Sequence, residues 1–227
     1  MRFTHIPCHQ YDLTAVTANG QRWYTTPDGS KYPSITTVLG QKEKPAITAW
    51  RMSLGPQKAD KETKRCTDRG DAVHLMAEHY LNNEENPTKG HQRDHIKLFS
   101  QLKFVLNKIN NIRAQEIPLF SDRIRVAGRV DCIGEYDGVL SIIDFKTSNG
   151  NKDAQMIEDY FLQATAYALM YEEMYGEFID QIVIIIAVEK GMVPLVFKRQ
   201  IDDYVVPLLE RINTFHTPNK GVQNGKA

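Results

Sequence analysis

Cysteine is scarce in this sequence. Only three occur among 227 residues, Cys8, Cys66 and Cys132, and they lie far apart. An odd number of scattered cysteines argues against a disulfide framework, and their spacing does not match a zinc motif. Stability must therefore come from a hydrophobic core, which 227 residues are enough to build within one domain.

Long apolar runs and a targeting signal are also lacking. No run approaches the roughly 20 residues that a membrane-spanning helix needs. The first residues, Met-Arg-Phe-Thr-His-Ile-Pro, contain neither the apolar stretch of a signal peptide nor the Arg/Ser-rich pattern of a transit peptide. We therefore expect no membrane association and a reducing cytoplasmic setting.

The chain has no excess of either charge, with 28 basic and 28 acidic residues. The charges are nevertheless unevenly spread. Residues 41–69 hold eight Lys/Arg and four Asp/Glu, a net of +4, whereas residues 131–177 hold two and ten, a net of −8. The acidic part suits a metal site, and the basic part could hold a phosphate backbone. Alternatively, residues 58–69 form only a solvated helix face.

A β-hairpin brings two aspartates together. Asp137-Gly138 is a strong signal for a two-residue turn. Counting outward from this turn places Asp131 opposite Asp144, and directly opposed side chains lie on one face of the sheet. Lys146, two residues beyond Asp144, points to the same face.

Opposed carboxylates repel each other unless they share a proton or bind a cation. Mg²⁺ or Mn²⁺ is the natural cation for oxygen ligands, and a lysine alongside can orient a water or neutralise developing charge. This combination suggests hydrolysis of a phosphodiester. The alternative is that both aspartates face solvent, but the strand over 139–145 is almost wholly apolar and predicts burial. A bulge could also shift the register.

The spacing of apolar residues predicts a mixed α/β fold, with a β-rich segment over residues 1–32. Helices are expected over residues 34–39, 67–81, 90–112, 154–175 and 203–213, together with one that carries Trp50 and Arg51 and ends at Gly55-Pro56; strands are expected over 114–120, 124–136, 139–146, 181–188 and 193–198.

Several motifs occur in a characteristic order. They are Gly-Asp-Ala-Val-His at 70–74, Gly-Arg-Val-Asp at 128–131, Ile-Ile-Asp-Phe-Lys-Thr-Ser at 142–148, and Gln-Ala-Thr-Ala-Tyr at 163–167. In this order they resemble the RecB-type exonuclease branch of the PD-(D/E)XK nuclease superfamily. One departure is that Val130 stands where the superfamily motif has the proline denoted by P in PD-(D/E)XK. Residues 32–39 are also similar to a segment in the family of mitochondrial genome maintenance exonucleases and their phage-encoded relatives. The resemblance covers residues 30–190.

The resemblance implies a restriction-endonuclease-like core over 67–200, an N-terminal β/helical elaboration over 1–66, and a C-terminal helix and tail over 201–227. It implies that His74, Asp131, Asp144 and the Phe145 carbonyl bind Mg²⁺ or Mn²⁺, while Lys146 supports the attacking water. Three cysteines cannot hold the iron–sulfur cluster of some relatives. Glu78 is a candidate partner of His74, or only a helix-surface glutamate.

Gln163 and Tyr167 are four residues apart on one helix, where relatives use such a pair to position the lysine, the water or a phosphate. A packing stripe that includes Tyr160 and Tyr171 is the alternative. The expected nucleic-acid contacts are Trp50, Arg51, Arg69 and Arg129, because aromatic and basic side chains bind bases and phosphates.

The sequence thus predicts a metal-dependent DNA exonuclease that prefers single-stranded ends, acting in DNA replication, recombination or repair. Two alternatives stay open, a structure-specific or recombination endonuclease and an inactive nucleic-acid-binding module. A bacterial or phage-infected cell is favoured over the mitochondrial matrix.

Overall fold

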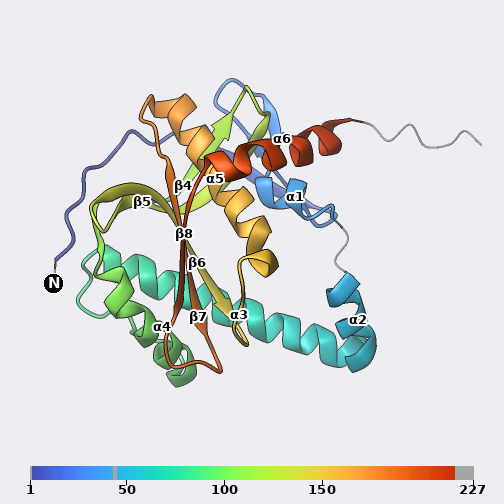
Figure 1. The fold of residues 1–227 in the computed structure, drawn as a ribbon, viewed down its shortest axis with the longest axis vertical. Coiled ribbons are helices and arrows are strands. Elements are labelled where there is room, and N and C mark those ends of the chain that lie inside the picture. Colours follow the sequence, from blue (N-terminus) through green and yellow to red (C-terminus); the bar gives the residue numbers. More distant parts are fainter. Residues whose placement is uncertain (1, 43–44, 218–227) are drawn as a thin grey trace, which may run out of the picture.

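A five-stranded sheet forms the centre of the computed structural model, which describes residues 2–42 and 45–217 (Figure 1). The strands lie in sequence order: β4 (Ile109–Ser121), β5 (Val126–Tyr136), β6 (Val139–Ser148), β7 (Gln181–Val188) and β8 (Leu195–Gln200). Only β6 and β7 run parallel, because the long α5 helix connects them, and the other neighbours are antiparallel. The predicted mixed sheet flanked by helices is confirmed.

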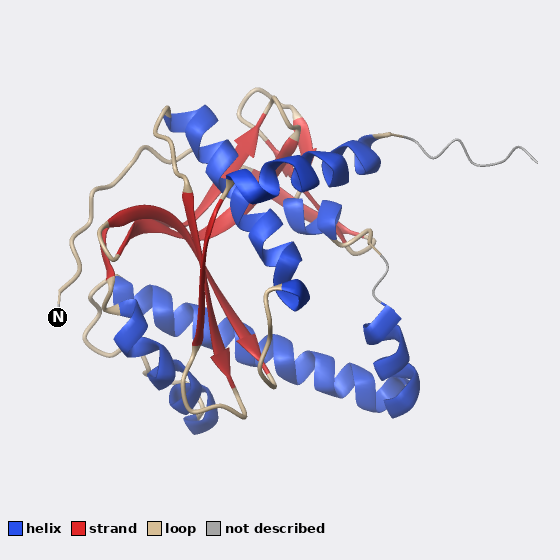
Figure 2. Cartoon of the chain, viewed as in Figure 1, coloured by secondary structure: helices blue, strands red, loops and turns tan. Residues whose placement is uncertain are grey.

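Helices cover both faces of this sheet (Figure 2). Along β6, Ile142 belongs to a core cluster with α5 (Glu158–Tyr175) and α6 (Asp202–His216). The next residue, Ile143, belongs to a second cluster with α3 (Pro56–Leu81) and α4 (Arg93–Leu106). Alternate side chains thus enter two cores, so the strand is apolar throughout.

The N-terminal residues form a smaller three-stranded sheet of β1 (Thr14–Ala18), β2 (Gln21–Thr25) and β3 (Lys31–Pro33). The short α1 (Ile35–Leu39) follows, with Ser34 as its N-cap, and then α2 (Pro45–Leu54). A short 3-10 turn, η1 (Gln155–Ile157), precedes α5. None of the helices in the described ranges is long and apolar enough to cross a bilayer.

Two predicted helices have different limits in the structure. The helix expected over 90–112 ends at Leu106, and β4 begins at Ile109. Ile109 and Ile112 are three residues apart and are buried in one cluster, a spacing that fits one face of a helix. In β4 the two side chains reach the same cluster because the strand has a register shift after Asn110. The helix expected from residue 67 begins eleven residues earlier at Pro56, because the first half of α3 is too polar to show a period. The predicted tail lies outside the described residues from residue 218 on.

Candidate active site

The hairpin between β5 and β6 has the predicted register. Asp137 and Gly138 both have positive φ angles, 52° and 82°, as a type I′ turn requires. Pairing runs from Tyr136–Val139 to Cys132–Ile143 and ends there. Asp131 and Asp144 are therefore the first residues beyond the ladder, at a fork where β5 leaves β6.

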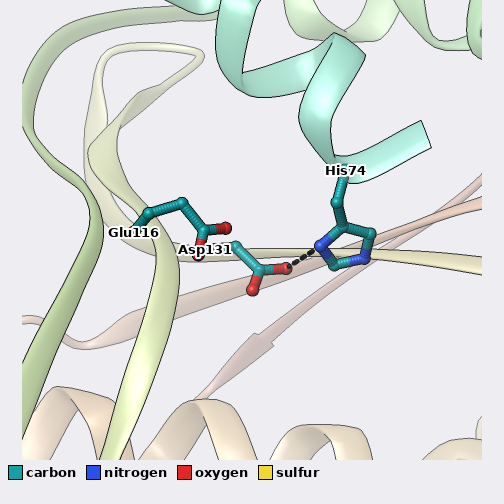
Figure 3. Close-up of side chains that lie close together, drawn as sticks. All are labelled: His74, Glu116 and Asp131. Carbon is teal, nitrogen blue, oxygen red and sulfur yellow. Dashed lines mark ion pairs between the residues drawn. The ribbon is translucent and has the colours of Figure 1, made fainter. Parts of the chain in front are cut away.

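Asp131 occupies this fork. Its Oδ2 accepts a hydrogen bond of 2.8 Å from the Phe145 N–H, in place of a strand-to-strand bond. The same oxygen lies 3.4 Å from Nδ1 of His74 on α3 (Figure 3). The carboxylate thus joins β5, β6 and α3 at one point.

Asp144 is buried beside the fork and pairs with Lys146, whose side chain is 19% exposed. Lys146 Nζ donates to Asp144 Oδ1 at 2.6 Å, which confirms that both side chains share one face of β6. Asp144 is only 1% exposed. Among the described residues no hydrogen bond reaches its Oδ2, although Lys146 Nζ lies 2.5 Å away as an ion pair. The Lys146 ammonium thus lies against both oxygens of this buried carboxylate.

Glu116 also belongs to the site, although sequence reasoning did not identify it. Ligand atoms of His74, Glu116 and Asp131 all lie within 4.8 Å of one another. Figure 3 shows the Glu116 side chain, from β4, directed toward Asp131. Glu116 has a φ of 52°, a left-handed conformation that is uncommon for residues other than glycine.

A local irregularity of β4 explains this orientation. Ala114 and Ile117 are three residues apart, yet both contact the α5 core, and so do Val130 and Ile133 on β5. Residues three apart on a regular strand point to opposite faces. Each strand therefore holds one extra residue, β4 between Ala114 and Ile117 and β5 between Val130 and Ile133. The pairing of β4 with β5 is interrupted at this point.

Burial and mutual repulsion perturb the acidic groups. Burial raises the pKa of Asp144; Lys146 lowers it, and Asp131 raises it further. Burial also raises the pKa of Glu116 to about 7, together with the charges of Asp131 and Glu78. For Lys146, burial acts to lower the pKa, but Asp144 and Asp131 outweigh this effect and raise it, so the amine is held as an ammonium.

These residues fit a divalent cation. Carboxylate oxygens suit Mg²⁺ and Mn²⁺, and the imidazole of His74 favours Mn²⁺. A cation would relieve the repulsion between the Glu116 and Asp131 carboxylates. The Phe145 ring packs 6.2 Å from the His74 ring on the α3 side, whereas its carbonyl as a ligand stays a prediction.

Gln163 and Tyr167 form a pair on α5 on the opposite side of β5. Gln163 Nε2 donates to Tyr167 Oη at 2.9 Å, and Tyr167 is 2% exposed. Glycine at position 128 permits this approach, because a Cβ there would lie 2.7 Å from Tyr167 Cε1. The first glycine of the Gly-Arg-Val-Asp motif is thus explained by packing.

Most of these groups line a cleft of about 580 Å³. Its walls come from α3, from β4 and β5, from α5 and from the N-terminal segment. The lining residues include Arg22, Tyr24, Ser34, Thr36, Thr67, Gly70, Asp71, His74, Glu78, Glu116, Arg129, Asp131, Gln163 and Tyr167. Asp144 and Lys146 lie behind Asp131 and do not line it.

The predicted nucleic-acid contacts lie in different surroundings. Arg129 is exposed in the cleft, and its Nη1 donates to the Glu116 carbonyl at 2.8 Å. Trp50 is 37% exposed on α2, a helix that buries none of its residues. Arg51, next to it, is paired with Asp60 of α3.

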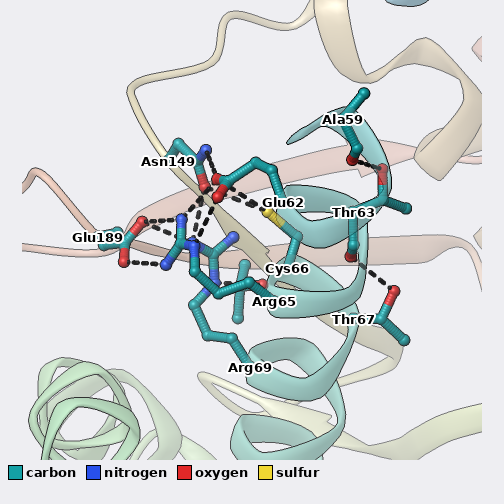
Figure 4. Close-up of polar contacts among 10 residues, drawn as sticks. Ala59, Glu62, Thr63, Arg65, Cys66, Thr67, Arg69, Asn149 and Glu189 are labelled. Atoms are coloured by element: carbon teal, nitrogen blue, oxygen red, sulfur yellow. Dashed lines mark hydrogen bonds and ion pairs between the residues drawn. The ribbon is translucent and has the colours of Figure 1, made fainter. Parts of the chain in front are cut away.

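Arg69 is buried and does not face the cleft. Its Nη1 donates to Asn149 Oδ1 and Glu189 Oε2, both at 2.7 Å (Figure 4). Arg65, one turn earlier on α3, binds Glu189 from the solvent side. Arg69 therefore ties α3 to the ends of β6 and β7, and its guanidinium is occupied by protein partners.

Comparison with known proteins agrees with this geometry. Residues 89–191 match the PD-(D/E)XK nuclease superfamily. This part of the chain thus resembles a PD-(D/E)XK nuclease domain, and the five-stranded mixed sheet flanked by helices is consistent with the restriction-endonuclease-like fold of that superfamily. A solved structure, "Crystal structure of SSO0001", covers 80% of this chain and 73% of its own at a TM-score of 0.42 and 13% identity.

The curated relatives are named mitochondrial genome maintenance exonuclease 1. The Mus musculus protein is 26% identical over 172 residues, which are 70% of this chain and 50% of that protein. The Homo sapiens protein is 27% identical over 174 residues, again 70% of this chain and 50% of the relative. The chain spans about half the length of these relatives.

Replacing Gly128 with alanine is expected to destabilise the protein by about 1–3 kcal/mol, because the new Cβ would overlap the Tyr167 ring. The measurement is the urea midpoint of unfolding. Gly150→Ala is the matched control, since a Cβ there meets nothing within 4 Å. Equal midpoints for the two variants would contradict the packing role of Gly128.

Replacing Arg69 with alanine is expected to lower the free energy of unfolding by about 3 kcal/mol, because Glu189 and Asn149 lose a buried partner. Arg65→Ala removes an exposed guanidinium and is expected to lower it by about 1 kcal/mol or less. Both are measured by chemical denaturation. A larger effect at Arg65 would show that the solvent-side pair, and not Arg69, holds α3.

Proposed function

We propose that this protein is a metal-dependent exonuclease that hydrolyses DNA phosphodiester bonds and prefers single-stranded ends. One observation carries the proposal: His74, Glu116 and Asp131 gather their ligand atoms within 4.8 Å, beside the Asp144–Lys146 pair. Two carboxylates and an imidazole in the cleft, with a third carboxylate and an ammonium beside it, are the groups that such hydrolysis requires.

The ligand set that we propose is His74, Glu116, Asp131 and Asp144, with the Phe145 carbonyl as suggested by family resemblance. A bound Mg²⁺ or Mn²⁺ would polarise the phosphoryl group and lower the pKa of a water. The Asp131 carboxylate is oriented by the Phe145 N–H, so its other oxygen is free to face the cleft. His74 is held by its contact with Asp131.

Lys146 supports hydrolysis as a cation. Its ammonium lies against Asp144 and 5.3 Å from the Tyr160 ring, which fixes its position. A fixed ammonium at this place donates to the attacking water or to an oxygen that gains charge in the transition state. Gln163 and Tyr167, hydrogen-bonded to each other, would orient the phosphate from the α5 side.

Two observations support DNA ends as the substrate. The curated relatives carry the name exonuclease, and 70% of this chain aligns with them. In addition, α2 presents Trp50 to solvent at the N-terminal end of α3, away from the five-stranded sheet (Figure 1). An exposed indole can stack on an unpaired base.

Lys146→Ala is expected to abolish degradation of end-labelled linear single-stranded DNA in Mg²⁺ or Mn²⁺, because the charge at the reacting phosphate is no longer stabilised. EDTA should do the same to the unchanged protein. Lys152 lies in an exposed loop shortly after β6. Lys152→Ala therefore serves as the control and should retain full activity.

A circular single strand tested in parallel decides the mode of cleavage. Loss of linear DNA alone supports an exonuclease, and cutting of the circle would favour an endonuclease instead. Binding without cleavage in either metal would contradict the proposal and indicate an inactive binding module.

Trp50→Ala is expected to weaken binding of single-stranded DNA by about 1–3 kcal/mol, because one stacking contact is lost. Fluorescence anisotropy with a labelled oligonucleotide measures the affinity, and Mn²⁺ binding should not change. Met52→Ala on the same helix is the control, since Met52 is 78% exposed and has no ring to stack. Equal affinity of the Trp50 variant and the unchanged protein would exclude this contact.

A further inference from the structure

The cleft has two walls of opposite character. One wall carries the acidic groups of α3, β4 and β5, among them Glu78, Glu116 and Asp131. The other wall comes from the N-terminal segment and contributes Arg22 on β2 together with the hydroxyls of Ser34 and Thr36. A divalent cation accounts for the first wall, but it does not explain the second.

Arg22 is held in a fixed place relative to the nuclease strands. Its backbone N–H donates to Thr37 Oγ1 at 2.9 Å, and its carbonyl accepts from the Ser34 N–H at 2.7 Å. Ser34 in turn forms a bridge with Ala127 of β5. The N-terminal sheet is thus attached to β5 only a few residues from Asp131.

Two guanidinium groups line the cleft, that of Arg22 on the N-terminal wall and that of Arg129 on β5. Arg22 is exposed, and its Nε makes one long contact of 3.4 Å with Thr17 Oγ1. Arg129 uses Nη1 for the Glu116 carbonyl. Within residues 2–42 and 45–217, neither arginine has a carboxylate oxygen within 4.0 Å. By contrast, Arg65 and Arg69 on the far side of α3 are both paired with Glu189.

Hydroxyl groups complete the arrangement. Ser34 is 2% exposed and its Oγ lies 2.9 Å from Thr36 Oγ1, while Thr36 itself is exposed at the cleft. Two guanidinium groups that have no carboxylate oxygen within 4.0 Å among the described residues, together with a hydroxyl, offer donors and positive charge to a ligand in the cleft. Phosphate oxygens are the ligands that such a set selects.

We propose that Arg22, Arg129 and Thr36 form a phosphate-binding subsite that holds a second phosphate of the DNA strand while the scissile one lies at the fork. This inference rests on the proposed function. The second phosphate is either an internal phosphodiester or the phosphomonoester at a strand end, and both present the same oxygens to these donors.

The test is binding of a short oligothymidylate, measured by anisotropy in EDTA over a series of salt concentrations. Arg22→Gln should weaken binding about tenfold, because a charge-assisted hydrogen bond is lost. It should also reduce the slope of log K against log salt by about 0.7, the value for one phosphate of a single strand. Arg123→Gln, an arginine with 77% of its side chain exposed and outside the cleft, is the control and should change neither quantity.

Thr36→Val and Arg129→Gln provide independent variants should Arg22→Gln fail to fold by circular dichroism. Oligonucleotides with a 5′-phosphate, a 3′-phosphate or hydroxyl ends, and a circular strand, identify the source of the phosphate. An effect confined to one phosphorylated end assigns the subsite to that terminal phosphate. An equal effect on all strands assigns it to an internal one.

Unchanged affinity and slope for all three variants would overturn the subsite. This failure is distinct from a failure of the proposed function, because the unchanged protein is assayed separately for cleavage of linear DNA in Mn²⁺. Cleavage with no effect of the cleft variants removes only the subsite. Binding effects without cleavage remove the nuclease assignment and retain the phosphate contact.

Discussion

The separation of β5 from β6 immediately beyond Cys132 and Ile143 is the constraint on which the candidate site depends. If the ladder continued, Asp131 and Asp144 would oppose each other directly, and their two negative charges would repel each other at close range. Because the strands part, Asp131 takes the Phe145 N–H while Asp144 stays buried against Lys146. The fork thus holds two carboxylates close together in two different environments.

The sequence predicted the parts of this arrangement that follow from local counting. Asp137-Gly138 fixes the turn, and the predicted register is confirmed from Tyr136–Val139 to Cys132–Ile143. The predicted opposition of Asp131 and Asp144 is wrong, because the strands part just before these residues. Glu116 lies outside that hairpin, and the turn between β4 and β5 over residues 122–125 has no Asp-Gly pair to set its register. There the pairs on either side, such as Ile117 with Val130, place Glu116 beside Asp131. The positive φ of Glu116 that turns it into the cleft carries no sequence signal.

Residues far from the turn could not be placed in this way. Arg69 lies in a basic segment and resembles a phosphate contact, but only the fold shows that Asn149 and Glu189 surround it. Arg22 shows the reverse case, because nothing in its local sequence indicates that Ser34 and Ala127 bring it to β5. In both cases the decisive partners are distant in sequence, and local periodicity contains no information about them.

α3 is one uninterrupted helix, and it connects three parts of the molecule that are otherwise separate. One helix of 26 residues carries the junction with α2, the Arg69 attachment and His74. Successive residues of an α-helix are rotated by about 100° and displaced by about 1.5 Å along its axis. Adding or removing one residue between Gly55 and Arg69 would therefore swing α2 about a quarter-turn around the helix axis while His74 stayed in place. The number of residues in this stretch sets the direction in which Trp50 points, which allows its sequence to vary more freely than its length.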